Sequence, residues 1–165
     1  MNQHSPFEEP AIRMLQTKLT LKSAPGPQVL GPDDAAGLIY RLVGNNDREH
    51  FVALYLNARH RVTHVHTVSI GTLTSTQVFP REVFKGAVLA NAAALVVGHN
   101  HPSGDATPSE EDKAAMTRLK AAGELIGIEL LDAIIVTPTG EFFSFAGLRL
   151  GTIRALRGEE VADGS

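Results

Sequence analysis

The stretch ALVVGHNHPSGDATPSEED, residues 94–112, runs from a strand pattern through a turn-rich loop into a helix start. Its first five residues, 94–98, are apolar or glycine, as in a strand buried on both faces, and they lead directly into His99. Prolines and glycine punctuate the loop that follows, and Ser109 begins a helix expected over 109–127. The stretch therefore predicts a strand–loop–helix unit.

The elements on either side of this unit indicate the fold class. Apolar residues recur at helical spacing after Pro32, and other short runs are continuously apolar or rich in β-branched residues. Helices are expected over 32–43, 81–91 and 109–127, and strands over 51–56, 61–70, 94–98, 130–137 and 141–145. Because these elements do not alternate as regular βαβ units, we expect an α/β fold of the α+β type, with a mixed β-sheet flanked by helices.

The length of 165 residues suits one main domain with a core of its own. We expect an N-terminal arm and Pro/Gly-rich linker over 1–31, the main domain over 32–150, and a C-terminal tail over 151–165. An apolar run at 12–21 suggests a helix or packing arm within the first segment. A domain of this size does not need a metal in order to fold, so any bound metal is expected to be functional.

Composition excludes several classes of site and protein. The chain has no cysteine, which excludes disulfides, thiolate zinc sites, thiol nucleophiles and the nucleobase deaminases that need a Cys pair. Neither a secretion signal nor a membrane-spanning apolar run is present, so we expect a cytoplasmic protein. The net charge of −3 does not favour DNA association. The basic cluster of Arg149, Arg154 and Arg157 precedes acidic residues and predicts an exposed surface.

The pair His99 and His101 has the spacing of two metal ligands at a strand end. Side chains two apart on a strand point to the same face, with Cα atoms about 6.5–7 Å apart. The loop can fold back so that Asp112, in the first turn of the expected helix, supplies a third ligand. Three protein ligands and an open position make a catalytic zinc site, in which a water molecule is acidified and a carbonyl is polarised.

The same residues also have a structural interpretation. Two histidines on a strand are commonly surface or core residues, and Ser109 with Asp112 forms the Ser-x-x-Asp pattern of a capping box. The acids of the first turn also suit the positive end of a helix dipole. A second His-x-His pair, His64 and His66, lacks the following loop and acidic helix start, so we interpret it as structural.

The full pattern resembles a known motif. His99-x-His101-Pro102, with Ser109 and Asp112 after it, looks like the JAMM motif of the JAB1/MPN metalloprotease superfamily. The segments HNHPSG…PSEED, GTLTSTQVFPREVF and LLDAIIV resemble the bacterial RadC family in particular, over about residues 32–148. This resemblance implies a JAB1/MPN-like fold, related in architecture to the cytidine-deaminase-like fold.

The resemblance also implies roles for individual residues. His99, His101 and Asp112 would bind one zinc ion per chain, and Ser109 would donate a hydrogen bond to the oxyanion. The superfamily places a general-base glutamate about fifty residues upstream at the start of an apolar strand, and Glu49 occupies that position. A rival base, Glu82, fits better as a first-turn acid of its helix.

Two departures from the RadC pattern stand out. The family usually carries an N-terminal helix-hairpin-helix module, for which the residues before the main domain are too few. Its Leu-Asp-His strand reads Leu131-Asp132-Ala133 here, which would alter the pocket if that histidine shapes it. Asp132 is expected either to support the site or to cap a strand end.

These inferences lead to three hypotheses of function. The first is a zinc-dependent hydrolase of the metallopeptidase type, with a peptide or protein substrate. The second is a role associated with DNA repair, as in the traditional description of RadC, although the charge does not support direct DNA binding. The third is a non-catalytic protein-interaction domain, against which the retention of the whole motif argues.

Overall fold

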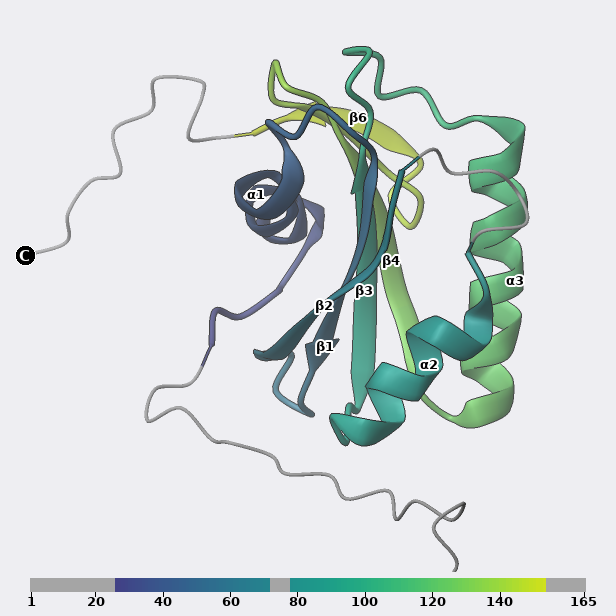
Figure 1. The fold of residues 1–165 in the computed structure, drawn as a ribbon. Helices are drawn as coiled ribbons and strands as arrows, with labels where there is room; N and C mark the ends of the chain where they lie inside the picture. Colours follow the sequence, from purple (N-terminus) through teal and green to yellow (C-terminus); the bar gives the residue numbers. More distant parts are fainter. Residues whose placement is uncertain (1–25, 72–77, 154–165) are drawn as a thin grey trace, which may run out of the picture.

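The computed structural model describes residues 26–71 and 78–153. Within these residues a six-stranded sheet lies between one helix on one face and two on the other (Figure 1). The elements are, in chain order, α1 (Pro32–Val43), β1 (His50–Leu56), β2 (Val62–Ile70), α2 (Pro80–Leu89), β3 (Ala94–Asn100), α3 (Glu110–Ile126), β4 (Glu129–Val136), β5 (Glu141–Ser144) and β6 (Arg149–Thr152). Every element expected from the sequence over the described residues is present.

The sheet has the strand order β2-β1-β3-β4-β5-β6. Neighbouring strands are antiparallel except β3 and β4, which are parallel and are joined by a crossover through α3. The mixed sheet flanked by helices is thus confirmed, and it is consistent with a JAB1/MPN-like architecture. The crossover places the carboxyl end of β3 near the amino end of α3, where the quoted stretch changes from strand to helix.

Two apolar cores, one on each face of the sheet, hold the helices in place. Alternate residues of β1 enter different cores: Val52 and Leu54 pack with α1, whereas Phe51 and Ala53 pack with α2 and α3. α1 approaches β3 closely, because a Cβ added to Gly98 would lie 2.4 Å from the Ile39 Cδ1 atom. The central strands are therefore buried on both faces, as their continuous apolar runs predicted.

The edges of the domain differ in detail from the sequence expectation. β6 was not predicted, because Arg149–Thr152 is short, contains glycine and has little apolar alternation. Arg149 is half exposed and forms an ion pair with Asp33 of α1 at 2.6 Å. Within the stretch interpreted as a linker, Gln28 forms a β-bridge with Arg61 and Val29 is buried. Both ends of the described chain thus add contacts to the sheet.

Some expectations fall on residues outside those described. These are the apolar run at 12–21, and Arg154 and Arg157 of the basic cluster. In the described part, no helix is long and apolar enough to cross a membrane.

Candidate metal centre

The two histidines of the central motif lie at the carboxyl end of β3. His99 points to the face covered by α2 and α3, as Val97 does, and its ring stacks on Phe51 of β1 with centroids 5.9 Å apart. His101 follows the last residue of the strand, and its N–H still donates to the Val136 carbonyl of β4 at 2.8 Å. Strand pairing therefore brings both imidazoles to one face, as the two-residue period predicts.

The third side chain comes from the first turn of α3. Ser109 is the N-cap, and its Oγ accepts a hydrogen bond from the Asp112 N–H at 3.1 Å. In return, Asp112 Oδ2 accepts from the Ser109 N–H at 2.8 Å, which completes the predicted capping box. The carboxylate of Asp112 is buried, and the cap holds it toward the end of β3.

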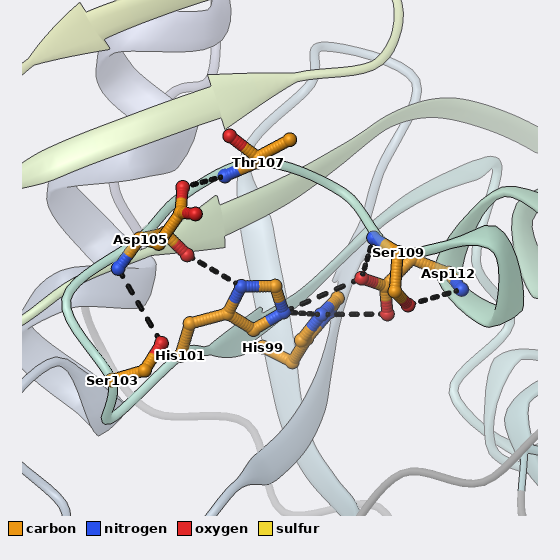
Figure 2. A network of polar contacts seen from close by, with 7 residues as sticks. All are labelled: His99, His101, Ser103, Asp105, Thr107, Ser109 and Asp112. Atoms are coloured by element: carbon orange, nitrogen blue, oxygen red, sulfur yellow. Dashed lines mark hydrogen bonds and ion pairs between the residues drawn. The ribbon is translucent and has the colours of Figure 1, made fainter.

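The three groups converge on one another (Figure 2). His99 Nε2 lies 3.0 Å from His101 Nε2 and 3.1 Å from Asp112 Oδ1, and His101 Nε2 lies 3.3 Å from Asp112 Oδ2. Tetrahedral zinc with bonds of about 2.0–2.1 Å needs donors about 3.3 Å apart. Two imidazole nitrogens and a carboxylate at these separations fit such an ion in both donor type and spacing.

The orientation of His101 is fixed from its other ring nitrogen. Nδ1 lies 2.7 Å from the carbonyl oxygen of Asp105, which can only accept a hydrogen bond, so Nδ1 carries the proton. The loop that presents this carbonyl is itself held by the Thr107 N–H, which donates to Asp105 Oδ1 at 2.9 Å. In the neutral ring Nε2 then keeps its lone pair for the centre, as in metal-binding histidines. No sequence pattern predicts this partner, because nothing in a sequence marks a particular backbone carbonyl as a hydrogen-bond acceptor.

The charges at the centre favour a shared cation. Burial opposes protonation of His101, but Asp112, the Asp105 carbonyl and the charge of Glu49 outweigh it and raise the pKa of His101 above its ordinary 6.5. Burial likewise opposes ionisation of Asp112, but His101, His99 and the Ser109 N–H hold the pKa of that carboxyl far below its ordinary value. Asp112 therefore favours a positive charge beside it, and a bound metal ion would supply one.

Glu49 lies beside this cluster. β1 pairs with β3 in the register Phe51↔His99, so the antiparallel alignment, extended by two residues, puts Glu49 opposite His101. The charge of Glu49 helps to raise the pKa of His101, which agrees with this placement. Glu49 also lines a cleft of about 560 Å³ together with Asp47, Arg48, Gly71, Pro102 and Ser103. The predicted base is therefore near enough to His101 for its charge to act there, and it borders a cleft that also includes Pro102, the residue after His101.

Asn100, between the two histidines, has contacts that the sequence did not predict. Its side chain is fully buried and bonds to the backbone of the segment 46–50, which carries Glu49. Its partners are about fifty residues away in the sequence, so no local pattern indicates them.

The other candidate residues lie away from the centre. Glu82 is on the first turn of α2, where its ion pair with Lys85 at 2.7 Å lowers the pKa of its exposed carboxyl.

In the second His-x-His pair, His66 Nδ1 lies 2.9 Å from the Tyr55 hydroxyl, and burial raises the pKa of Tyr55 to about 12. His64 Nδ1 lies 3.0 Å from the hydroxyl oxygen of its neighbour Thr63. Among the described residues, His99, His101 and Asp112 form the one group of at least three His, Cys, Asp or Glu side chains that could hold a metal ion.

Asp132 stabilises a turn. Its carboxylate accepts hydrogen bonds from the Ser144 hydroxyl at 2.7 Å, the Ala133 N–H at 2.7 Å and the Ala146 N–H at 2.9 Å. Of the two roles left open by the sequence, these bonds favour the structural cap. Ala133 is buried on the α3 face and lines a separate cavity of about 300 Å³ along α3 and β4.

Comparisons with known proteins agree with the fold and the motif. The family model described as RadC-like JAB domain matches residues 29–150. The UPF0758 protein of Rubrobacter xylanophilus is 47% identical over 123 residues, which cover 74% of this chain and 54% of that relative. The UPF0758 protein of Desulforudis audaxviator is 52% identical over 110 residues, which cover 67% of this chain and 48% of that relative. The UPF0758 protein YsxA of Bacillus subtilis is 49% identical over 108 residues, which cover 66% of this chain and 47% of that relative.

The chain spans about half the length of the curated relatives it matches. The match nevertheless includes all six strands in part or whole, the two histidines, the capped helix and Glu49. The chain belongs to the RadC-like JAB domain family.

Proposed function

We propose that this domain is a zinc-dependent hydrolase of amide bonds, of the metallopeptidase type. The observation that carries the proposal is the convergence of His99, His101 and Asp112, with the charge of Glu49 acting on His101 and the Ser109 hydroxyl at the same helix end. Buried histidines that served only the fold would not need an acid and a second imidazole within about 3 Å of them. The proposed substrate is a peptide or a protein.

His99, His101 and Asp112 would hold the metal. A bound divalent zinc ion would supply a Lewis acid that polarises the substrate carbonyl and acidifies water. The side chains are already oriented for this: His99 by its stacking on Phe51, Asp112 by the capping box, and His101 by the Asp105 carbonyl. Zinc suits two imidazole nitrogens and a carboxylate oxygen, and other divalent transition metals accept the same donors.

Glu49 and Ser109 would then do the proton transfer and the charge stabilisation. Glu49 takes a proton from water as the water oxygen bonds to the carbonyl carbon. It then gives this proton to the amide nitrogen as the C–N bond breaks, so that a carboxylic acid and an amine form and the carboxylate is regenerated. Ser109 uses its oxygen as the acceptor in the helix cap, which leaves its hydroxyl proton as a donor for the developing oxyanion. Each role matches a chemical capacity that the residue has in this structure.

The metal is tested first, by elemental mass spectrometry on untagged protein purified without chelator and on protein reconstituted with zinc. The wild type is expected to bind close to one zinc per chain, and the double variant His99→Ala, His101→Ala to bind almost none. The matched control is His64→Ala, His66→Ala, which alters the second His-x-His pair and should leave the zinc content unchanged. Equal zinc content in both double variants would refute the assignment of His99 and His101 as zinc ligands.

Activity is tested on a fluorogenic peptide library with the zinc-loaded chain. Glu49→Gln is expected to abolish cleavage while the zinc content stays the same, because the amide cannot accept the proton. The matched control Glu82→Gln changes an exposed helical acid and should retain full activity. Equal activity of Glu49→Gln and the wild type would exclude Glu49 as the base, and a zinc-loaded wild type without any cleavage would favour the interaction-domain alternative.

A further inference from the structure

The side chain of Asn100 forms the last link between β3 and the chain that enters β1. Backbone pairing between these strands runs from Leu56↔Ala94 to Phe51↔His99. One position further, the His50 N–H donates to the side-chain oxygen of Asn100 at 2.7 Å. The amide nitrogen of Asn100 donates to the Arg48 carbonyl at 2.9 Å and to the Asn46 carbonyl at 3.3 Å. One buried side chain thus binds three backbone groups of the segment 46–50.

These bonds enclose the backbone of Glu49. The carbonyl before it, of Arg48, and the N–H after it, of His50, are both bound by Asn100. The carbonyl of Glu49 itself accepts from the Gly71 N–H at 2.8 Å, at the end of β2. Gly71 has φ of +122°, a conformation that side chains disfavour, so this position suits glycine. Glu49 is therefore held from β3 on one side and from β2 on the other.

Few side chains can make this set of bonds. It requires one acceptor for an N–H and two donors for carbonyls in a planar group of this length, which is the inventory of an asparagine amide. Aspartate would keep the acceptor but turn an oxygen toward two carbonyl oxygens. Alanine would leave three backbone groups without these partners, and a backbone group that stays buried without a partner is unfavourable.

We propose that Asn100 is a positioning residue that holds Glu49 in front of the metal centre, so that one strand end supplies two metal ligands and the fixation of the base. The proposal rests on the proposed function, because it gives Glu49 the role of the base. The geometry makes the link short: Asn100 is bonded to both neighbours of Glu49, and its own neighbours in the chain are His99 and His101. A base displaced by about 1 Å can lose about 100-fold in rate.

The clamp itself is tested by amide hydrogen exchange on the full chain without added metal. Asn100→Ala is expected to raise the exchange rate of the His50 N–H at least tenfold. The matched control is Asn57→Ala at the other end of β1, where the Asn57 side chain accepts from the N–H groups of Arg59 and Arg61 at 2.9 and 3.0 Å. The control should raise the exchange rates of the Arg59 and Arg61 amides and leave that of the His50 amide unchanged. Unchanged exchange at His50 in Asn100→Ala would overturn the proposal.

The position of the base is tested with Co²⁺ alone as a paramagnetic probe. In the Co²⁺-loaded wild type and in Asn57→Ala, the carbon resonance of the Glu49 carboxylate should be strongly broadened, and in Asn100→Ala clearly less, at equal metal content. Undiminished broadening in Asn100→Ala would reduce Asn100 to a structural residue. If the alanine variant does not fold, Asn100→Asp replaces it in the Co²⁺ measurement, because this variant keeps the size of the side chain but loses both donors to the carbonyls of Asn46 and Arg48.

Kinetics separate the two proposals from each other. On any peptide that the wild type cleaves, Asn100→Ala should lower kcat by about 10- to 100-fold with KM nearly unchanged and zinc fully retained. An unchanged kcat would refute the positioning role. A wild type that binds Co²⁺ and cleaves nothing would end the hydrolase proposal, whereas the broadening of Glu49 would still decide whether Asn100 places that side chain at the centre.

Discussion

Replacing Asp112 by asparagine should separate the metal centre from the helix cap. The amide oxygen of asparagine can still accept the Ser109 N–H, but the charged oxygens that lie 3.1 and 3.3 Å from the two imidazoles are lost. Hydrogen bonds to charged groups contribute about 1.5–3 kcal/mol. With about 2–4 °C per kcal/mol for a chain of this size, a loss of about 2 kcal/mol lowers the Tm of the metal-free protein by about 6 °C.

The zinc-induced shift should respond more strongly. Zinc at 100 times its Kd adds about 2.7 kcal/mol to the wild type, or about 8 °C. If loss of the carboxylate weakens binding 100-fold, the same zinc concentration adds about 0.4 kcal/mol to Asp112→Asn, or about 1 °C. Thermal unfolding followed by circular dichroism, with and without zinc at pH 7.5, measures both shifts.

Ser109→Ala is the control for the cap. It removes the acceptor for the Asp112 N–H and should cost about 1 kcal/mol without metal, yet keep the zinc-induced shift. The metal-free penalty of Asp112→Asn should also be larger at pH 6 than at pH 8.5. The raised pKa of His101 means that the imidazole is charged at the lower pH and gains most from the carboxylate there. A full zinc-induced shift in Asp112→Asn would refute the assignment of Asp112 as a ligand.

Three other outcomes are expected. Because the pKa of His101 lies above 6.5 and a metal binds the neutral ring, zinc affinity should fall as the pH drops from 8 to 6, with increasing proton release by calorimetry in two buffers; a pH-independent affinity would contradict this. Gly98→Ala should destabilise the protein by about 1–3 kcal/mol in urea, because its Cβ would meet Ile39 Cδ1, and Ile39→Val should restore part of the loss. Asp132→Ala should cost about 1–3 kcal/mol by leaving the Ser144 hydroxyl and two N–H groups without their acceptor, while zinc content stays unchanged; a loss of zinc would instead assign Asp132 to the centre.

The site was predictable where its geometry is local. The two-residue period of a strand places His99 and His101 on one face, and the three-residue spacing of a capping box places Asp112 at the start of α3. Both patterns depend on neighbours in the sequence and on no other part of the fold. The position of Glu49 came from the family resemblance, and the pairing of β1 with β3 supplies its physical basis.

The rest depends on contacts between distant segments. The strand order, the bonds of Asn100 to the segment 46–50 and the ring of donors around Asp132 all join residues brought together only by the folded sheet. β6 carries too little hydrophobic pattern to be recognised before its partner β5 is known. The apolar residues of α3 do not all enter the core, because Leu125 is 89% exposed.

The side chains of the centre are each fixed by a contact that involves no metal: a ring stack for His99, a carbonyl for His101 and a helix cap for Asp112. Two apolar cores, one of which includes the Phe51 ring, maintain the strand and helix that carry them without a metal ion. A chelator should therefore remove a metal ion from this centre reversibly without unfolding the protein, and different divalent ions could be exchanged through the same folded molecule. Which ion acts in a cell would then follow from supply and exchange kinetics as much as from the ligands themselves.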